Sequence, residues 1–350
     1  MNNKAFYLDN LRIDCPITQA ALSGLSDWPM RLLAHRLGAG YSVCEVLLDR
    51  FVVQISSSKK AKRFIHVGDE DHPCGAQLMG NAPEQFAPAA LKLVETGFDC
   101  IDINFGCPVK KVLGRQRGGF LLSQPATALE IVAHVRDVVP AEIPVTVKMR
   151  RGIDLDNQSR DQFYEIFDGA FALGAAGITV HGRTVKQGYR GPSCWDFLRE
   201  VKQHAGSRIV LGSGDLFTPQ SCIAMMSQTG VDGVTIARGA IGNPWIFQQA
   251  RALLEGNPLP PPPSVHEQRD VIAEHYRLCE ETYGPKRCGR QMRKFGIKYS
   301  RLHPLSEEVR AAFVAVTQPE EWRTALEEHY ATDGPGRYPD MIDDSYGGSE

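Results

Sequence analysis

The chain has 350 residues, of which 43% are hydrophobic and 23% are charged, a composition typical of soluble globular proteins and a length sufficient for one large domain and a small one. A net charge of −2 excludes a chain that binds polyanions through its overall charge, so any nucleic-acid surface has to be a local patch. No apolar run is long enough to cross a bilayer, the first residues lack the core of a signal peptide, and the nine scattered cysteines include no CxxC pair. These features predict a cytoplasmic protein with reduced thiols and without a metal site.

Eight β-rich runs follow one another along the first two thirds of the chain, and amphipathic helical segments separate them. The expected strands cover residues 17–24, 41–48, 74–80, 98–106, 144–150, 177–183, 208–214 and 233–239. This regular alternation predicts a (β/α)8 barrel, a TIM barrel, over residues 1–254. A doubly wound open sheet is the alternative, but such sheets rarely use eight consecutive units of this regularity.

A proline-rich segment, residues 255–263, is expected to be a semi-rigid linker after the barrel. Ser264 and Glu267 have the spacing of a capping box, which predicts a helix that ends near Gly284. Further helices are expected over residues 286–302, 306–316 and 319–331, so residues 264–332 should form a small helical bundle. Residues 333–350 contain little that could be buried and are expected to be a disordered tail.

Polar residues interrupt the apolar strands at their carboxyl ends, which is the face where TIM barrels carry their active sites. Each alone is more often a satisfied structural residue. A set in phase around one rim is harder to explain in that way, because every member would need its own buried partner. The set comprises Gln77, Asn104, Lys148, His181, Ser213 and Arg238.

Lys148 is the most informative member of this set, because it follows a largely apolar strand segment. A buried ammonium group needs an anionic partner, or it has a depressed pKa and acts as a Schiff-base nucleophile. The glycine-rich turns at residues 212–219 and 236–244 follow the last two strands, where this fold commonly binds phosphate. Together these features predict a phosphorylated ligand.

Cys107 lies between Gly106 and Pro108, which end the fourth strand and place the thiol on the rim or in the next loop. Buried cysteines usually behave as small hydrophobic residues, an interpretation that suits Cys44 and Cys74. The loop that follows Cys107 contains several basic residues and no acidic one. The thiol can therefore act as a general acid, or as a nucleophile if the loop lowers its pKa.

Five motifs, taken together and in order, resemble those of the bacterial tRNA-dihydrouridine synthases, in particular the B-type branch. They are "DINFGCPVKKV", "VTVKMRRG", "VHGRTVKQGYRG", "GSGDLFTP" and "IARGAIGNPWIF", and the resemblance extends from about residue 12 to residue 331. The resemblance implies an FMN-dependent TIM barrel with a helical tRNA-binding domain. It also implies that NADPH reduces the flavin, that reduced FMN delivers a hydride to C6 of a uracil ring, and that Cys107 protonates C5 to give 5,6-dihydrouridine.

The same resemblance implies roles for further residues in a protein expected to be a monomer. FMN would be bound by Leu22, Gln77, Lys148, His181, Ser213, Gly214, Asp215, Ala237 and Arg238. The substrate tRNA would be bound by Asn104, Arg183, Lys110, Lys111, Arg287, Arg290, Lys294 and Lys298.

The chain departs from the family pattern in two turns. Residues 21–24 read Ala-Leu-Ser-Gly where the family usually has Pro-Met-Ala-Gly, and Ser213-Gly214 stands where Asn-Gly is usual. The first change loosens the turn and alters its packing against a flavin ring.

Residues 286–301 carry seven basic residues and no acidic one. Five of them have helical spacing and share one face, beside an apolar face expected to pack on the bundle. This basic stripe, defined as Arg287, Arg290, Lys294, Lys298 and Arg301, could be a solvated surface. Next to a basic loop and a rim suited to a flat base, it predicts contact with tRNA phosphates.

Three alternatives stay open at the level of sequence: an FMN oxidoreductase that acts on a small molecule, an aldolase that uses Lys148, and a tRNA-binding relative that has lost its activity. The aldolase would be trapped by borohydride at Lys148 and would not be yellow.

Overall fold

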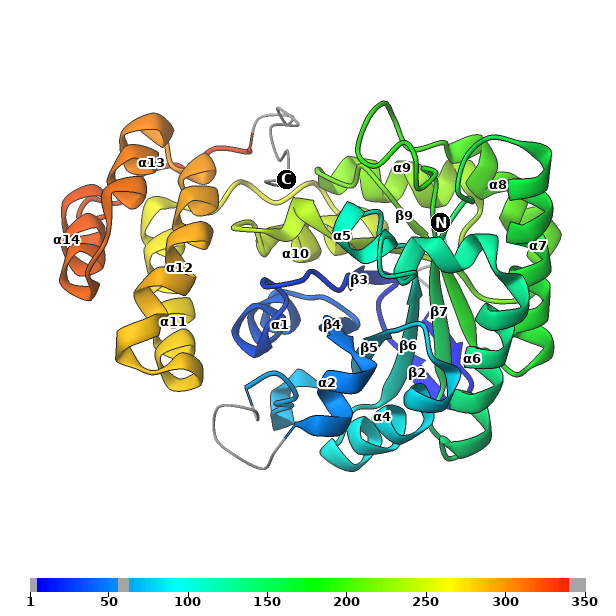
Figure 1. Ribbon diagram of the computed structural model, residues 1–350. Helices are drawn as coiled ribbons and strands as arrows, with labels where there is room; N and C mark the ends of the chain where they lie inside the picture. Colours follow the sequence, from blue (N-terminus) through cyan, green and yellow to red (C-terminus); the bar gives the residue numbers. More distant parts are fainter. Residues whose placement is uncertain (1–4, 56–62, 340–350) are drawn as a thin grey trace.

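The computed structural model describes residues 5–55 and 63–339, and its centre is a closed barrel of eight parallel strands (Figure 1). The strand order around the barrel is β10-β3-β4-β5-β6-β7-β8-β9, which closes the sheet between the first and the last strand. The structure thus confirms the predicted TIM barrel. The strands are β3 (Ile17–Gln19), β4 (Ser42–Leu48), β5 (Cys74–Met79), β6 (Cys100–Phe105), β7 (Val145–Arg150), β8 (Gly177–His181), β9 (Val210–Ser213) and β10 (Gly233–Ile236).

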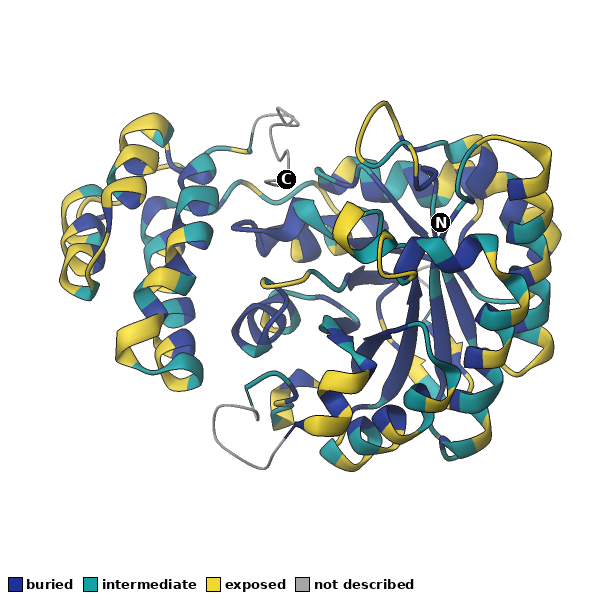
Figure 2. Cartoon of the chain, viewed as in Figure 1, coloured by how far each residue is buried: buried dark blue, intermediate teal, exposed yellow. Residues whose placement is uncertain are grey.

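Helices surround the barrel and bury their apolar faces against the strands (Figure 2). Proline in the first turn of several of these helices fixes the start, because proline needs no hydrogen-bond partner there. The helices are α1 (Trp28–Arg36), α2 (Asp49–Gln54), α4 (Pro83–Thr96), α5 (Lys110–Leu113), α6 (Pro125–Val138), α7 (Asn157–Ala172), α8 (Trp195–Ala205), α9 (Pro219–Thr229) and α10 (Trp245–Leu254). Short 3-10 turns lie at η1 (Asp69–Asp71), η2 (Gly118–Ser123) and η3 (Arg238–Ala240).

The register of the barrel brings the polar strand ends to one level. Asn104 of β6 is paired with Lys148 of β7, Arg150 of β7 with His181 of β8, and His181 with Ser213 of β9. Since neighbouring parallel strands run in the same direction, all of these side chains lie near the carboxyl end of the sheet.

An antiparallel hairpin closes the opposite end of the barrel and was not expected from the sequence. Its strands are β1 (Phe6–Leu8) and β2 (Leu11–Ile13), and Phe6, Leu8 and Ile13 are buried against Tyr41 and Leu211. Each strand has only three residues, which is too short for a recognisable alternation of apolar and polar positions.

A helical region follows the barrel and packs against one side of it (Figure 1). It consists of α11 (Val265–Tyr283), α12 (Pro285–Tyr299), η4 (Ser300–Leu302), α13 (Ser306–Ala315) and α14 (Pro319–His329). Ser264 caps α11 with Glu267 in the predicted capping box, and the helix ends at Gly284. Leu278 of α11 packs on Leu32 and Leu33 of α1, which fixes the helical region to the barrel.

The predicted disordered tail is wrong for residues 333–339. The N–H of Val265 donates to the carbonyl of Gly334, the N–H of Arg337 donates to the carbonyl of Leu302, and the Tyr338 hydroxyl donates to the carbonyl of Pro260 at 2.6 Å. The segment is ordered because these bonds tie it to the linker, to α11 and to η4, although it buries few apolar side chains. The prediction for residues 340–350 lies outside the described residues.

All nine cysteines are free thiols. In the described part of the chain, none of the helices combines the length and the apolar character needed to cross a membrane.

Candidate active site

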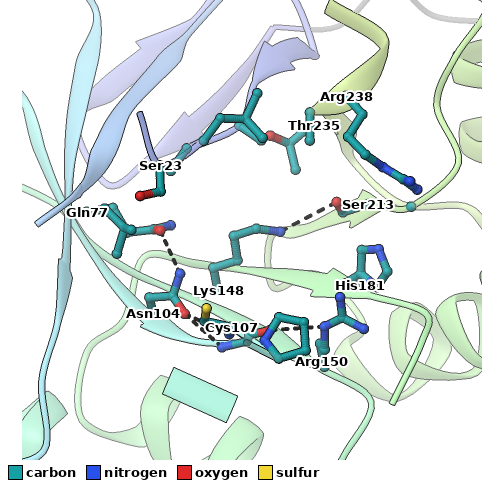
Figure 3. A pocket seen from close by; sticks show the side chains of 18 of the residues that line it. Ser23, Gln77, Asn104, Cys107, Lys148, Arg150, His181, Ser213, Thr235 and Arg238 are labelled. Carbon is teal, nitrogen blue, oxygen red and sulfur yellow. Dashed lines mark hydrogen bonds between the residues drawn. The ribbon is translucent and has the colours of Figure 1, made fainter. Parts of the chain in front are cut away.

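A cavity of about 290 Å³ opens at the carboxyl ends of the barrel strands (Figure 3). Eleven residues that the sequence singled out line it: Leu22, Gln77, Asn104, Cys107, Lys148, His181, Ser213, Gly214, Asp215, Ala237 and Arg238. The fold therefore brings together side chains that are more than 200 positions apart in the sequence.

Lys148 rises from β7 into the cavity, and its Nζ lies 3.5 Å from the Ser213 hydroxyl of β9. Burial lowers the pKa of Lys148 to about 8; the Asp102 carboxylate opposes this shift and Arg150 adds to it. An anion that enters the cavity would stabilise the charged form of Lys148, because it would compensate the buried positive charge.

His181, at the end of β8, accepts the backbone N–H of Arg183 at Nδ1. This bond fixes the tautomer, so the hydrogen of the neutral ring is on Nε2. Burial, together with Arg150, Lys148 and other nearby cations, holds the pKa of His181 well below its usual value. The ring is therefore a neutral hydrogen-bond donor at the cavity.

Cys107 is half-buried on the rim, in the turn that follows β6. Asn104 holds this turn: its side-chain Oδ1 accepts the backbone N–H groups of Gly106 at 3.0 Å and Cys107 at 3.1 Å. Burial raises the pKa of the Cys107 thiol, although the Val109 backbone and Arg150 lower it in part. The thiol is consequently protonated at neutral pH, as a general acid must be.

The turn after β9 forms the opposite wall of the cavity. Gly214 has a φ of 118°, and a Cβ there would lie 2.4 Å from the Ser193 hydroxyl and 3.1 Å from Nε2 of His181. Only glycine permits this close approach of the backbone to His181. The first predicted phosphate turn, residues 212–219, therefore requires glycine at position 214.

Arg238 lines the cavity and belongs to the second predicted phosphate turn, residues 236–244. Its guanidinium group lies over two aromatic rings, 4.7 Å from the centre of Tyr189 and 4.9 Å from that of Phe217. These contacts keep a cationic group at the cavity.

The structure corrects the substrate role expected for Arg183. This side chain is 1% exposed, donates to Asp215 Oδ2 at 2.8 Å, and also donates to the carbonyl of Gly191. Asp215 accepts the Ser193 N–H as well. Arg183 and the Asp215 carboxylate therefore support the cavity wall instead of presenting free groups to a ligand.

Lys294 also differs from the expectation. It donates to the carbonyl of Gly24, and its ammonium group interacts with the Asp27 and Glu45 carboxylates. Glu45 in turn accepts the Gly24 N–H. Lys294 therefore fixes α12 to the atypical turn at residues 21–24 and is not directed toward solvent as a phosphate ligand.

The other predicted tRNA ligands lie on the surface. Lys110 and Lys111 are exposed at the start of α5, and Arg287 and Arg290 are exposed on the first half of α12. Lys298 is half-buried near η3 and, with Arg238 and Arg301, lines a small cavity between the barrel and the helical region. The basic stripe is thus exposed in its first half and covered in its second.

Arg150 is a cavity residue that the sequence analysis missed. It donates to the carbonyls of Gly106, Thr184 and Gly188 at 2.7–3.0 Å and lies 5.5 Å from the centre of the Tyr189 ring. The signal was present, because residues two apart on a strand share a face and Arg150 follows Lys148 by two. Arg150 holds together the loops after β6 and β8.

The described residues contain no group of three or more His, Cys, Asp or Glu side chains arranged to hold a metal ion. The cavity instead offers hydrogen-bond donors, the three cationic side chains of Lys148, Arg150 and Arg238, a neutral histidine and a protonated thiol. Fold and cavity together define an enzyme of the TIM-barrel class whose site suits a ligand that is anionic and rich in acceptors.

The comparisons with known proteins identify the family. The family model described as dihydrouridine synthase (Dus) matches residues 18–333. Relatives named tRNA-dihydrouridine synthase B include those of Xanthomonas campestris (36% identical, covering 86% of this chain and 88% of the relative), Yersinia pestis (34%, 93% and 97%) and Shigella flexneri (33%, 89% and 94%). The chain belongs to the dihydrouridine synthase family, which is a family of oxidoreductases.

Solved structures support the fold alone. An old yellow enzyme homologue from Zymomonas mobilis matches with a TM-score of 0.52 at 14% identity, over 74% of this chain and 93% of that one. Histamine dehydrogenase from Rhizobium sp. 4-9 matches with a TM-score of 0.56 at 15% identity, over 84% and 50%.

Proposed function

We propose that this protein reduces uridines of tRNA to 5,6-dihydrouridine, with FMN in the barrel cavity and NADPH as the reductant. The observation that carries the proposal is the Cys107 thiol, which stands protonated on the rim of a cavity lined by Lys148 and His181. Family membership and the tRNA-dihydrouridine synthase B relatives support the same reaction.

The residues present fit FMN. A flavin has a flat ring system whose carbonyl groups and ring nitrogens accept hydrogen bonds, and a phosphate at the end of its side chain. Lys148, His181 and the amide of Gln77 supply donors for the ring. The turns at Gly214 and Ala237, with Arg238, supply backbone and charge for the phosphate. Leu22, Ser213 and Asp215 complete the wall.

When bound, the flavin supplies the hydride that C6 of the uracil ring receives. Cys107 donates its proton to C5, and the Asn104-bound turn holds the thiol at the rim where a flat base can enter. Lys148 places positive charge in the cavity and stabilises an anionic cofactor. Uracil, hydride and proton together give 5,6-dihydrouracil.

A folded tRNA must turn its uridine outward to reach the cavity, and recognition of shape and backbone suits this requirement. We assign phosphate contacts to Lys110 and Lys111 of α5 and to Arg287 and Arg290 of α12, which are exposed. Residues 1–254 would then be the catalytic part, 255–263 the linker and 264–332 the tRNA-binding part of a cytoplasmic monomer.

The test uses purified protein, FMN, NADPH and unmodified tRNA, with mass spectrometry of the nucleosides before and after. Uridine should gain two hydrogens with the wild-type protein and not with Cys107→Ala. If NADPH oxidation depended on a small enone and did not respond to tRNA, the protein would be a small-molecule reductase instead. Binding of tRNA without flavin would replace the proposal with a non-catalytic relative, and borohydride trapping of a carbonyl compound on Lys148 would replace it with an aldolase.

A further inference from the structure

A buried carboxylate lies below the active-site cavity and has no part in the mechanism above. Asp102 of β6 is 4% exposed and points into the barrel, where its two oxygens accept short hydrogen bonds. The Thr146 hydroxyl donates to Oδ1 at 2.6 Å, and the Gln77 amide nitrogen donates to Oδ2 at 2.6 Å. Asp102 is therefore anchored to β7 on one side and to β5 on the other.

In one direction the hydrogen bonds continue from Asp102 to the backbone of the turn that carries the Cys107 thiol. With Nε2 of Gln77 turned toward Asp102, its Oε1 faces Asn104 and accepts from Nδ2 at 2.6 Å. Asn104 then presents Oδ1 to the turn and accepts the N–H groups of Gly106 and Cys107 (Figure 3). We call this chain of bonds from Asp102 through Gln77 and Asn104 to Cys107 the amide relay.

The direction of the amide relay depends on its buried end. An amide side chain can be turned over to exchange its oxygen and nitrogen, and only its partners decide between the two orientations. A carboxylate accepts hydrogen bonds and cannot donate them, so Asp102 can bond to the amide nitrogen of Gln77 but not to its amide oxygen. Burial raises the pKa of Asp102, whereas the hydrogen bonds from Thr146 and Gln77 and the nearby Lys148 ammonium act against this shift and favour the ionised form.

If Gln77 were turned over, Asn104 would have to turn as well, and its NH2 group would face the N–H groups of Gly106 and Cys107. Donors would then face donors, and the turn would open.

We propose that Asp102 is a positioning residue: its acceptor oxygen sets the orientation of Gln77 and Asn104, and thereby holds the turn that presents the Cys107 thiol. A second contact, from the Gly119 N–H to the Cys107 carbonyl at 3.0 Å, holds the far side of the turn and does not depend on the amide relay. The inference rests on the proposed function where it concerns the orientation of Cys107 as an acid. The effect of Asp102 on the turn does not depend on any activity of the protein.

The test compares four variants by hydrogen–deuterium exchange in the protein alone, on peptides that contain Gly106 and Cys107. Asp102→Leu removes the acceptor, and Gln77→Met keeps the carboxylate but cuts the amide relay one link later. Both should increase exchange at the turn about tenfold, the effect of losing a hydrogen bond of ordinary strength. Asp102→Asn should stay near wild type, because its oxygen can face Gln77 while Thr146 rotates to accept its NH2 group.

Thr146→Val is the matched control, because it also alters a hydrogen bond to Asp102 but leaves the bond to Gln77 intact. Alkylation of thiols by iodoacetamide gives a second readout within the same samples. Cys107 and Cys194 are the half-buried thiols and the other seven are buried. Asp102→Leu and Gln77→Met should change the rate at Cys107 and leave that at Cys194 unchanged.

Activity separates positioning from folding. Asp102→Leu should lower kcat for tRNA about tenfold with little change in KM, and Asp102→Asn should restore most of it. Unchanged exchange at the turn in both Asp102→Leu and Gln77→Met would overturn the inference, as would an Asp102→Asn protein as impaired as Asp102→Leu. Should Asp102→Leu fail to fold, Gln77→Met alone decides. A wild-type protein that does not reduce tRNA would refute the proposed function and leave the exchange result standing.

Discussion

The rim of the barrel and helix α12 both carry several positive charges, but they hold them in different ways. At the rim, Lys148 and Arg150 are held by neighbouring groups, and burial lowers the pKa of each. On the first half of α12, Arg287 and Arg290 are exposed side chains. A buried charge held in place interacts strongly with a ligand. An exposed charge contributes little by itself, and several of them are needed for a sizeable effect. The rim should therefore control chemistry and cofactor binding, and α12 should control affinity for the nucleic acid.

The largest effect is expected at the rim for Cys107→Ala. Loss of the proton donor should lower the rate of tRNA reduction at least about 100-fold, since general acids commonly contribute that much. Single-turnover reoxidation of reduced flavin by tRNA measures the step directly. Cys194→Ala, at the other half-buried thiol, should retain the wild-type rate. If both variants lost the same fraction of the rate, Cys107 would not be the general acid.

The next effect concerns pH and the charge of Lys148. The pKa of Lys148 is lowered to about 8 in the free protein, so above pH 8 most of its side chain is neutral. An anionic cofactor favours the charged form, so above pH 8 its binding requires Lys148 to take up a proton. The affinity for FMN should be constant below pH 8 and fall by up to about tenfold per pH unit above it. Titration of flavin fluorescence from pH 6 to 10 measures this dependence.

Lys148→Met should bind FMN more weakly at pH 7 and lose the dependence on pH near 8. A dependence that persists in Lys148→Met would assign the titration to another group and weaken the contrast between the two regions.

Lys294 lies where the two regions meet, and its loss should affect stability. Lys294→Met leaves Asp27 and Glu45 without their cation and removes a bond to Gly24, so unfolding should become easier by about 1 to 2 kcal/mol. Urea denaturation measures the change. The exposed neighbour Arg293→Met should change the free energy of unfolding by less than about 0.5 kcal/mol. Equal effects would mean that Lys294 behaves as a surface residue.

The smallest effects are expected for Arg287→Gln and Arg290→Gln. Each should weaken tRNA binding about threefold and reduce the slope of log affinity against log salt by about one unit, with kcat unchanged. Fluorescence anisotropy at several salt concentrations measures both quantities. Arg323→Gln, exposed on α14, serves as the control and should bind as wild type. Unaltered salt slopes for both α12 variants would remove α12 from the tRNA surface.

The barrel could be predicted from the sequence because each strand carries its own signal, a short apolar run with a polar residue at its end. Lys148 and His181 could be selected in the same way. The roles of Arg183 and Lys294 could not, because a charged side chain looks the same in sequence whether it faces solvent or a carboxylate. Asp215 and Gly24, their respective partners, are 32 and 270 positions away. Local patterns locate the charge, and only the fold supplies its partner.

The same limit applies to Asp102 and to the turn it supports. A lone acidic residue inside an apolar strand signals burial, but the sequence does not show that Gln77 of another strand lies between Asp102 and Asn104. The order of these contacts follows from the barrel register, which pairs Gln77 with Asp102 and Asn104 with Lys148.

The hairpin β1–β2 has a consequence for the sequence of events in turnover. It seals the amino end of the barrel with Phe6 and Leu8, so the ligand cavity is reached from the carboxyl end. In the reaction proposed here, the nicotinamide and the uridine would both have to enter the cavity through that one opening. The two reactants would then take turns, with the oxidised nicotinamide leaving before the RNA enters, and initial-rate plots at varied concentrations of both should give parallel lines.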